Sequence, residues 1–264
     1  MGSYSPLELA QAYVRTAEWD FALEALAEHL QQHPSDQEAR RLRVDILLRQ
    51  SPASVWADLA QLDEQAAETW RLRALAHEQT GDLSQAITCL QTAHALAPHD
   101  AHLSERLLEL YGRMGDYASA LALIGQQPPT WGWLARAGEL HALRADYPAA
   151  LSAYSQALTL LMQGVPSPYR ASLAGRLYSA RGQVHQHLQG WTEAEADYAQ
   201  AQALLGADAG IQFNQGLLAC LRGNLEQAHD LCQRAYDAAN DALRAEMRRS
   251  LAGKAEYAVI HIEG

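Results

Sequence analysis

Histidine is the residue type in this sequence that most invites a chemical role, because 11 of the 264 residues are histidines. His29 and His33 stand four residues apart, and His185 and His187 stand two apart. A structural metal site needs about four ligands at defined spacing, and no His-Glu-x-x-His or Cys-x-x-Cys pattern accompanies these histidines. We therefore expect no metal site and assign the histidines to surface and packing positions.

The three cysteines, Cys89, Cys220 and Cys232, are too few and too scattered to form a disulfide framework. Cys220 and Cys232 could meet across a pair of helices, but small buried thiols are the expected state. The first residues lack a basic region followed by an apolar run, so we expect no signal peptide. No apolar stretch is long enough to span a membrane. Together these features predict a cytoplasmic protein with reduced thiols.

No motif for catalysis is visible. The sequence has no Gly-x-Ser-x-Gly turn, no phosphate-binding loop and no dinucleotide fingerprint. The formal net charge is -11, with 31 acidic residues against 20 basic ones, which argues against binding to a nucleic acid backbone. We expect no enzyme activity, no cofactor and no nucleic acid partner.

A short sequence phrase recurs along the chain and indicates an internal repeat. It consists of a small residue, an acidic or amide residue, an aromatic residue or Leu, two variable residues and then Ala. The copies end at Ala86, Ala120, Ala150 and Ala228, and looser copies end at Ala22 and Ala194. From Ala86 onward the successive spacings are 34, 30, 44 and 34 residues. A period of this length is the mark of a repeat architecture.

Each phrase lies between two segments with helical periodicity. Before Asp82, Trp70, Ala74 and His77 fall on one helical face. After it, apolar residues continue at helical spacing until Pro98, which ends the second helix. The phrase is therefore a turn between two antiparallel helices, and its alanine allows them to approach closely. We expect Ala86, Ala150 and Ala228 at helix contacts, where enlarging Ala150 to Leu would cost about 1–3 kcal/mol.

This register resembles the tetratricopeptide repeat of about 34 residues. Residues 67–100 match it best, through Trp70, Ala74, Ala86, Leu90, Ala93 and Pro98. The resemblance implies an all-α fold, a right-handed superhelical solenoid of antiparallel helix pairs with a C-terminal capping helix. It also implies one domain over residues 1–264, with about fifteen helices and no sheet.

The expected repeat units are 3–36, 37–66, 67–100, 101–130, 131–164, 175–208 and 209–242, with an insertion at 165–174 and a capping helix at 243–264. The second unit is short and has Trp56 where an alanine is expected. In the fourth unit, Gly125 and the Pro128-Pro129 pair should shorten the second helix. The insertion should form a turn at 164–168 and lengthen the first helix of the next unit.

The resemblance also implies a binding groove, because certain positions of each first helix point to the concave face. Carried over to this sequence, these positions are Gln11, Arg15, Arg41, Asp45, Arg49, Arg71, Glu78, Glu105, Glu109, Arg113, Glu139, Gln183, Gln186, Phe213 and Leu217. Arg41, Arg49, Arg71 and Arg113 would then engage an acidic stretch of a partner, unless nearby carboxylates neutralise them. Trp133 lies off the repeat core and is a further candidate contact.

The function that this pattern favours is a non-enzymatic adaptor or scaffold that binds a peptide or helix of another protein in the groove. An alternative is a component of bacterial envelope or pilus assembly, or a fragment of a larger regulator. An RNA-binding helical repeat is a weaker alternative, because such repeats need a basic surface.

The C-terminal region should close the last repeat. Leu243, Met247 and Leu251 lie on one helical row that would cover its apolar end. The following stretch, residues 257–262, is apolar and rich in β-branched residues. It would either fold back on the cap, which we favour, or pair two copies of the chain into a homodimer.

Overall fold

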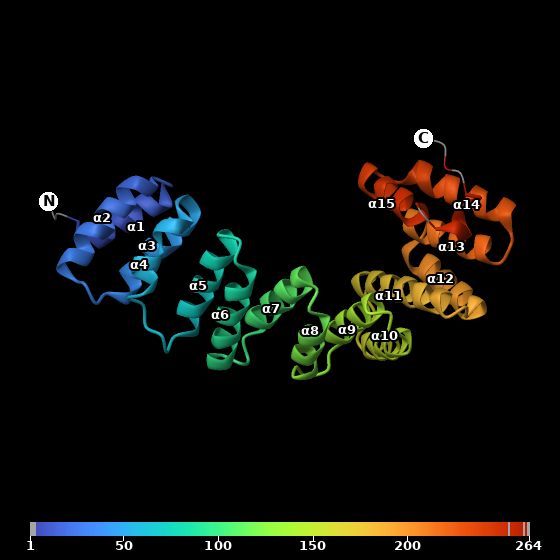
Figure 1. Ribbon diagram of the computed structural model, residues 1–264, viewed down its shortest axis with the longest axis horizontal. Helices are drawn as coiled ribbons and strands as arrows, with labels where there is room; N and C mark the ends of the chain where they lie inside the picture. The colour runs from blue at the N-terminus through green and yellow to red at the C-terminus, as the bar shows by residue number, and fades with distance from the viewer. Residues whose placement is uncertain (1–3, 253, 261, 263–264) are drawn as a thin grey trace. The chain divides into compact units, whose positions relative to one another are not determined.

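The computed structural model describes residues 4–252, 254–260 and 262, and within these ranges it contains fifteen α-helices, two short 3-10 helices and no strand (Figure 1). The predicted all-α fold of helix pairs is confirmed. In the first half the helices are α1 Pro6–Arg15, α2 Trp19–Gln32, α3 Gln37–Gln50, η1 Pro52–Ser54, α4 Trp56–Leu59, α5 Ala67–Gln79, α6 Leu83–Leu96 and α7 Ala101–Met114. In the second half they are α8 Tyr117–Gly125, α9 Trp131–Leu143, α10 Tyr147–Met162, α11 Pro168–His187, α12 Trp191–Leu205, α13 Ala209–Leu221, α14 Leu225–Ala238, α15 Asp241–Leu251 and η2 Ala255–Tyr257.

The chain divides into two compact units, Met1–Ala120 and Leu121–Gly264, which are called unit 1 and unit 2 below. The division falls within α8. Within unit 1, α1 pairs with α2 and α5 with α6; within unit 2, α9 pairs with α10, α11 with α12 and α13 with α14. One continuous domain over residues 1–264 stays a prediction, and Ser3, the expected first residue of the first repeat, lies outside the described residues.

The recurring phrase forms the turn between paired helices that its residues predict. Asp82 and Asp146 each precede a helix and accept a hydrogen bond from its first turn, at Gln85 and Ala149. The residue before each aspartate has a positive φ, which is 86° at Gly81 but also 57° at Ala145. Only glycine adopts this left-handed conformation without a steric cost, so the non-glycine copies of the turn are strained.

The alanines of the phrase lie in the interior. Ala86, Ala150 and Ala228 are completely buried, as expected for the contact points of paired helices. The expected turn and longer first helix around the insertion are also confirmed, because α11 begins at Pro168 and runs for 20 residues. Ser167 caps it by accepting a hydrogen bond from the backbone of Arg170.

The short second repeat closes without a full second helix. Residues 52–59 form only η1 and the four-residue α4. Val55 and Leu59 are buried there, whereas Trp56 is 37% exposed and its ring contacts that of His77 at a tilt of 52°. Asp58 is 2% exposed and accepts hydrogen bonds from two arginines of α3, Arg40 and Arg43. A buried ion pair thus helps to hold α4 on α3.

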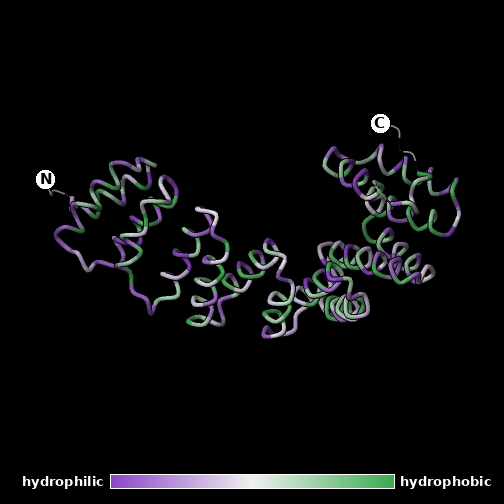
Figure 2. Tube along the Cα trace, viewed as in Figure 1, coloured by the Kyte–Doolittle hydropathy of each residue, from purple (hydrophilic) through white to green (hydrophobic). Residues whose placement is uncertain are grey.

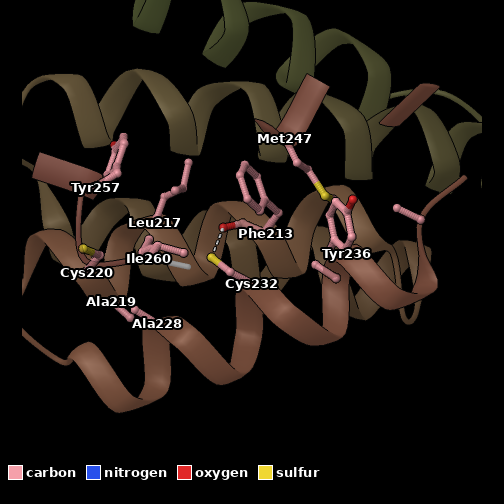
Figure 3. Close-up of a cluster of buried hydrophobic side chains, with 12 residues drawn as sticks. Phe213, Leu217, Ala219, Cys220, Ala228, Cys232, Tyr236, Met247, Tyr257 and Ile260 are labelled. Carbon is pink, nitrogen blue, oxygen red and sulfur yellow. Dashed lines mark hydrogen bonds between the residues drawn. The ribbon is translucent and has the colours of Figure 1, made fainter. Parts of the chain in front are cut away.

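The last repeat is covered by α15 and by the residues that follow it. Met247 of α15 is 1% exposed and packs in one cluster with Phe213 and Tyr236 (Figure 3). The capping helix α15 spans Asp241–Leu251, whereas the sequence predicted a capping helix over 243–264. Figure 2 shows hydrophilic and hydrophobic residues interleaved along the helices. Across the described ranges, none of the helices combines the length and hydrophobicity of a membrane span.

Candidate functional site

Three of the predicted groove residues meet at one pocket in unit 1. Asp45 and Arg49 of α3 and Arg71 of α5 line a pocket of about 610 Å³. The other lining residues are mostly apolar, and they are Val14, Trp19, Leu42, Ile46, Leu48, Leu75 and Gln79. Successive first helices therefore provide an apolar surface bordered by charged groups. We call this the unit 1 pocket.

The two arginines of the unit 1 pocket are in different electrostatic states. Arg71 forms an ion pair with Glu68, at 2.5 Å between Nη2 and Oε1. Within the described part of the chain, Arg49 forms no ion pair, and its guanidinium lies 5.9 Å from the centroid of the Trp19 ring. Arg49 is therefore the arginine of the pocket with no carboxylate at ion-pair distance among the described residues, and its charge acts on Asp45 four residues earlier.

Asp45 brings negative charge to the same pocket. Asp45 keeps an exposed surface, but partial desolvation raises the pKa of its carboxyl group, and the nearby charges of Arg71 and Arg49 partly oppose the shift. A carboxylate that loses hydration in this way is stabilised by a hydrogen-bond donor. The pocket thus offers an acceptor at Asp45 and a donor at Arg49 beside an apolar surface.

A second set of predicted groove residues forms an ion-pair cluster between α5 and α7. The carboxylate of Glu78 is 6% exposed and pairs with Arg113 at 3.3 Å and also with Arg106. Arg106 pairs in addition with Glu109. The carboxylates and guanidinium groups of this cluster pair with one another. Arg113 is therefore neutralised by a carboxylate of the same chain, as Arg71 is, which was the alternative to binding an acidic partner.

The remaining predicted residues of unit 1 lie outside the pocket. Arg15 and Glu105 are exposed on α1 and α7, and Gln11 is half-buried. Arg41 is half-buried, and its Nε is buried without a hydrogen-bond partner. The structure therefore brings only part of the predicted set together. In unit 2, Glu139 is exposed and pairs with Arg136 one helical turn away.

The other predicted residues of unit 2 surround a second cavity. Gln183 and Gln186 of α11 and Phe213 and Leu217 of α13 line a space of about 620 Å³ that α15 and η2 also border. Phe213 and Leu217 are only 5% and 7% exposed. We call this space the unit 2 groove.

One wall of the unit 2 groove is formed by residues that follow α15. Residues 254–260 and 262 follow α15 and return to α13; we call them the return segment. Tyr257 and Ile260 are each 7% exposed and belong to the same buried cluster as Phe213 and Leu217 (Figure 3). The stretch folds back, as favoured from the sequence, and its contacts extend beyond α15 to α13. His261 lies outside the described residues.

The other residues singled out from the sequence are the histidines, the three cysteines and Trp133. In the described ranges no group of three or more His, Cys, Asp or Glu residues is arranged to hold a metal ion. Cys89, Cys220 and Cys232 are buried free thiols, and burial raises the pKa of Cys232 to about 12. Trp133 is half-buried on α9 and lines neither of the two cavities described above.

Comparison with known families identifies the repeat. Tetratricopeptide repeat models match residues 67–100 and residues 7–51. These ranges cover the helix pair α5–α6, the pair α1–α2 except for Pro6, and all of α3. The chain is a tetratricopeptide repeat protein. A search of curated proteins finds no significant match.

Solved structures show the same fold at low sequence identity. The tetratricopeptide repeat chain resembles the C-terminal part of a repeat-containing protein from Cytophaga hutchinsonii, with a TM-score of 0.64 and 12% identity over 92% of this chain and 98% of that one. A tetratricopeptide repeat protein from Parabacteroides merdae matches at a TM-score of 0.53 and 14% identity, over 92% and 96% of the two chains. A chain of the Naa15/Naa10 assembly bound to HypK-THB matches at a TM-score of 0.59 and 14% identity over 93% of this chain. The chain spans only 37% of the length of that larger protein.

Tetratricopeptide repeats support a role as a protein–protein interaction scaffold. Sequence reasoning missed several residues that complete the two cavities in this tetratricopeptide repeat protein. Leu42 and Leu75 line the unit 1 pocket, and helical spacing from Arg49 and Arg71 could have found them. Lys254 and Tyr257 of the return segment had no such signal, because their place in the unit 2 groove depends on how the chain folds back.

Proposed function

We propose that the chain is a non-enzymatic scaffold that binds a peptide or helix of a partner protein, and that the unit 1 pocket is its docking point. The observation that carries the proposal is the convergence of Asp45, Arg49 and Arg71 from α3 and α5 on one largely apolar pocket. Solenoids of helix pairs commonly bind partners along such surfaces.

The chemistry of the pocket defines the ligand. Leu42, Ile46 and Leu75 provide the apolar surface on which an aliphatic or aromatic anchor would be buried. Arg49, which has no ion-pair partner among the described residues, would meet a carboxylate of the ligand. A partner segment with an acidic residue next to an apolar anchor fits both features.

Peptide display tests the proposal. A library of random peptides would be selected on the wild-type protein, and the selected peptides would then be measured against Arg49→Glu. Reversing the charge should weaken binding at least tenfold, because a carboxylate in place of the guanidinium repels the acidic residue of the ligand. Arg41 is a poorer target, since its half-buried position would make the new carboxylate a folding defect.

The matched control is Arg144→Glu, a charge reversal at an exposed arginine of unit 2. It should leave the affinity unchanged. Selection of peptides without acidic residues, or equal affinity for wild type and Arg49→Glu, would reject the pocket as the docking point. We further propose that the scaffold acts in the cytoplasm, a compartment in which its three free thiols stay reduced.

A further inference from the structure

The return segment contacts α13 through two side chains that are three residues apart. Successive turns place them on the same side, since the backbone N–H of Tyr257 donates to Lys254 O and that of Ile260 donates to Tyr257 O, at 3.1 and 3.0 Å. Both side chains are buried, whereas Val259 between them is 51% exposed. The segment therefore has one apolar face and one exposed face.

Tyr257 is held by a chain of two hydrogen bonds. The hydroxyl of Tyr257 accepts a hydrogen bond from Nε2 of Gln186 at 3.3 Å. Gln186 is held in turn by Tyr198, whose hydroxyl donates to its Oε1 at 2.9 Å. Tyr198 is completely buried in the core of the preceding repeat. The amide that receives Tyr257 is thus fixed by the fold of α11 and α12.

The other polar contacts of the return segment with the helices are few. The thiol of Cys220 donates to the carbonyl of Glu256 at 3.3 Å. The ammonium of Lys254 lies 5.6 Å from the centroid of the Tyr257 ring, within the segment itself. Most of the attachment therefore comes from burying the side chains of Tyr257 and Ile260.

The unit 2 groove leaves open space beside the return segment. About 620 Å³ of space remains, bordered by amide side chains such as Gln183, Gln189 and Asn214 and by the return segment itself. A surface with two apolar subsites, a fixed amide and open space beside them has the features that can accept a short peptide motif.

We propose that the unit 2 groove is a docking surface for a partner segment that forms a tight turn and carries a tyrosine and an aliphatic residue three positions apart. The return segment occupies this surface in cis and competes with the partner. This inference concerns unit 2 alone and does not depend on the unit 1 pocket.

A fluorescent peptide with the sequence of residues 254–262 is the probe, and fluorescence anisotropy is the measurement. The receptor is the full chain with Tyr257→Ala and Ile260→Ala, which empties the two subsites. The peptide should bind this variant saturably and bind wild type at least tenfold more weakly, because a tethered competitor has a high effective concentration. A peptide in which both anchors are alanine should not bind, and replacing its tyrosine by phenylalanine should weaken binding about threefold to tenfold through loss of one hydrogen bond.

The matched control changes only the exposed face of the segment. The full chain with Ala258→Ser and Val259→Ser keeps both anchors and should exclude the peptide as wild type does. If the double alanine variant loses helix content by circular dichroism, a protease site inserted after Ala252 serves instead. Cleavage then converts the return segment into a free ligand, whose dissociation is followed by dilution.

Three results would overturn the proposal. The first is a folded double alanine variant that does not bind the peptide, and the second is binding that is indifferent to the two anchors. The third is a wild-type mass in light scattering that doubles with concentration and falls to that of a monomer in the double alanine variant. That result would make a second copy of the chain the occupant, through exchange of return segments.

Discussion

Gly182 of α11 lies directly against the ring of Tyr198 of α12. A Cβ atom added to this glycine would be 2.8 Å from the ring, closer than real contacts allow. The same relationship recurs between Gly138 and Tyr154, where the distance would be 2.7 Å. In both repeats the large residue follows the glycine by sixteen positions. The missing side chain on the first helix is what makes room for the aromatic ring on the second.

Gly182→Ala should therefore destabilise unit 2, although alanine is the better helix former. Overpacking against a completely buried tyrosine costs about 1–3 kcal/mol. The control is Gly112→Ala in α7, where an added Cβ would meet nothing within 4 Å. That change should raise stability by about 0.5–1 kcal/mol through helix propensity. Urea denaturation followed by circular dichroism measures both, and destabilisation of equal size in the two variants would contradict the packing account.

Ala145→Gly should stabilise the turn between α9 and α10. Ala145 has a φ of 57°, a conformation that costs a residue with a side chain roughly 1–2 kcal/mol. Glycine removes this strain but has more freedom in the unfolded chain, so the net gain should be about 0.5–1 kcal/mol. Gly223→Ala, at the equivalent turn with a φ of 83°, should lose a similar amount. Thermal denaturation midpoints that move in the same direction would refute the strain argument.

Asp58→Asn should destabilise unit 1 strongly. The carboxylate is buried and pairs with both Arg40 and Arg43, so its removal leaves two largely buried guanidinium groups without an anion. Breaking one partner of such a buried pair typically costs about 3–5 kcal/mol. The exposed Asp63→Asn in the following loop is the control and should change the free energy of unfolding by less than about 1 kcal/mol. A small effect of Asp58→Asn in urea denaturation would mean that α4 does not depend on this ion pair.

Acid should destabilise unit 1 in part through Asp36. A hydrogen bond from the side chain of His29 and others from the first turn of α3 lower the pKa of this carboxyl group in the folded state. The unfolded value is about 3.9. The stabilising contribution is therefore complete above that pH and is lost as the pH falls through the lower folded pKa.

Asp36→Asn keeps a capping side chain but removes this titration, so its thermal midpoint should fall less than that of wild type between about pH 5 and pH 3. Asp20→Asn, at an exposed position, should follow the wild-type pH dependence. Parallel curves for wild type and Asp36→Asn would exclude Asp36 as a contributor.

Local pattern predicts the helix pairs of this chain well, because each turn carries its own signals. The aspartate caps at Asp82 and Asp146 and the buried alanines are visible within a few residues of sequence. The ion pairs are not, since Asp58 meets Arg40 and Glu78 meets Arg113 only after the helices have packed. Sequence reasoning could therefore name charged groove positions but not which of them would be neutralised.

The second cavity shows the same limit more clearly. The resemblance to the tetratricopeptide repeat assigns Phe213 and Leu217 to the groove face of α13 and implies an apolar groove there. Both side chains are buried, because Tyr257 and Ile260 return to them from about forty residues further along the chain. The composition of an apolar stretch predicts that it will be buried. It does not predict which surface of the protein the stretch will pack against.

The three buried thiols can serve as chemical probes of local unfolding in three parts of the molecule. An alkylating reagent attacks a thiolate, and burial disfavours that form, most strongly at Cys232. Reaction therefore has to wait until local unfolding exposes each sulfur. The alkylation rate of Cys89 would report the opening of α6 in unit 1. The alkylation rate of Cys220 would report the release of the return segment from α13. Cys232 of α14 faces α13, so its alkylation rate would report the separation of the last helix pair.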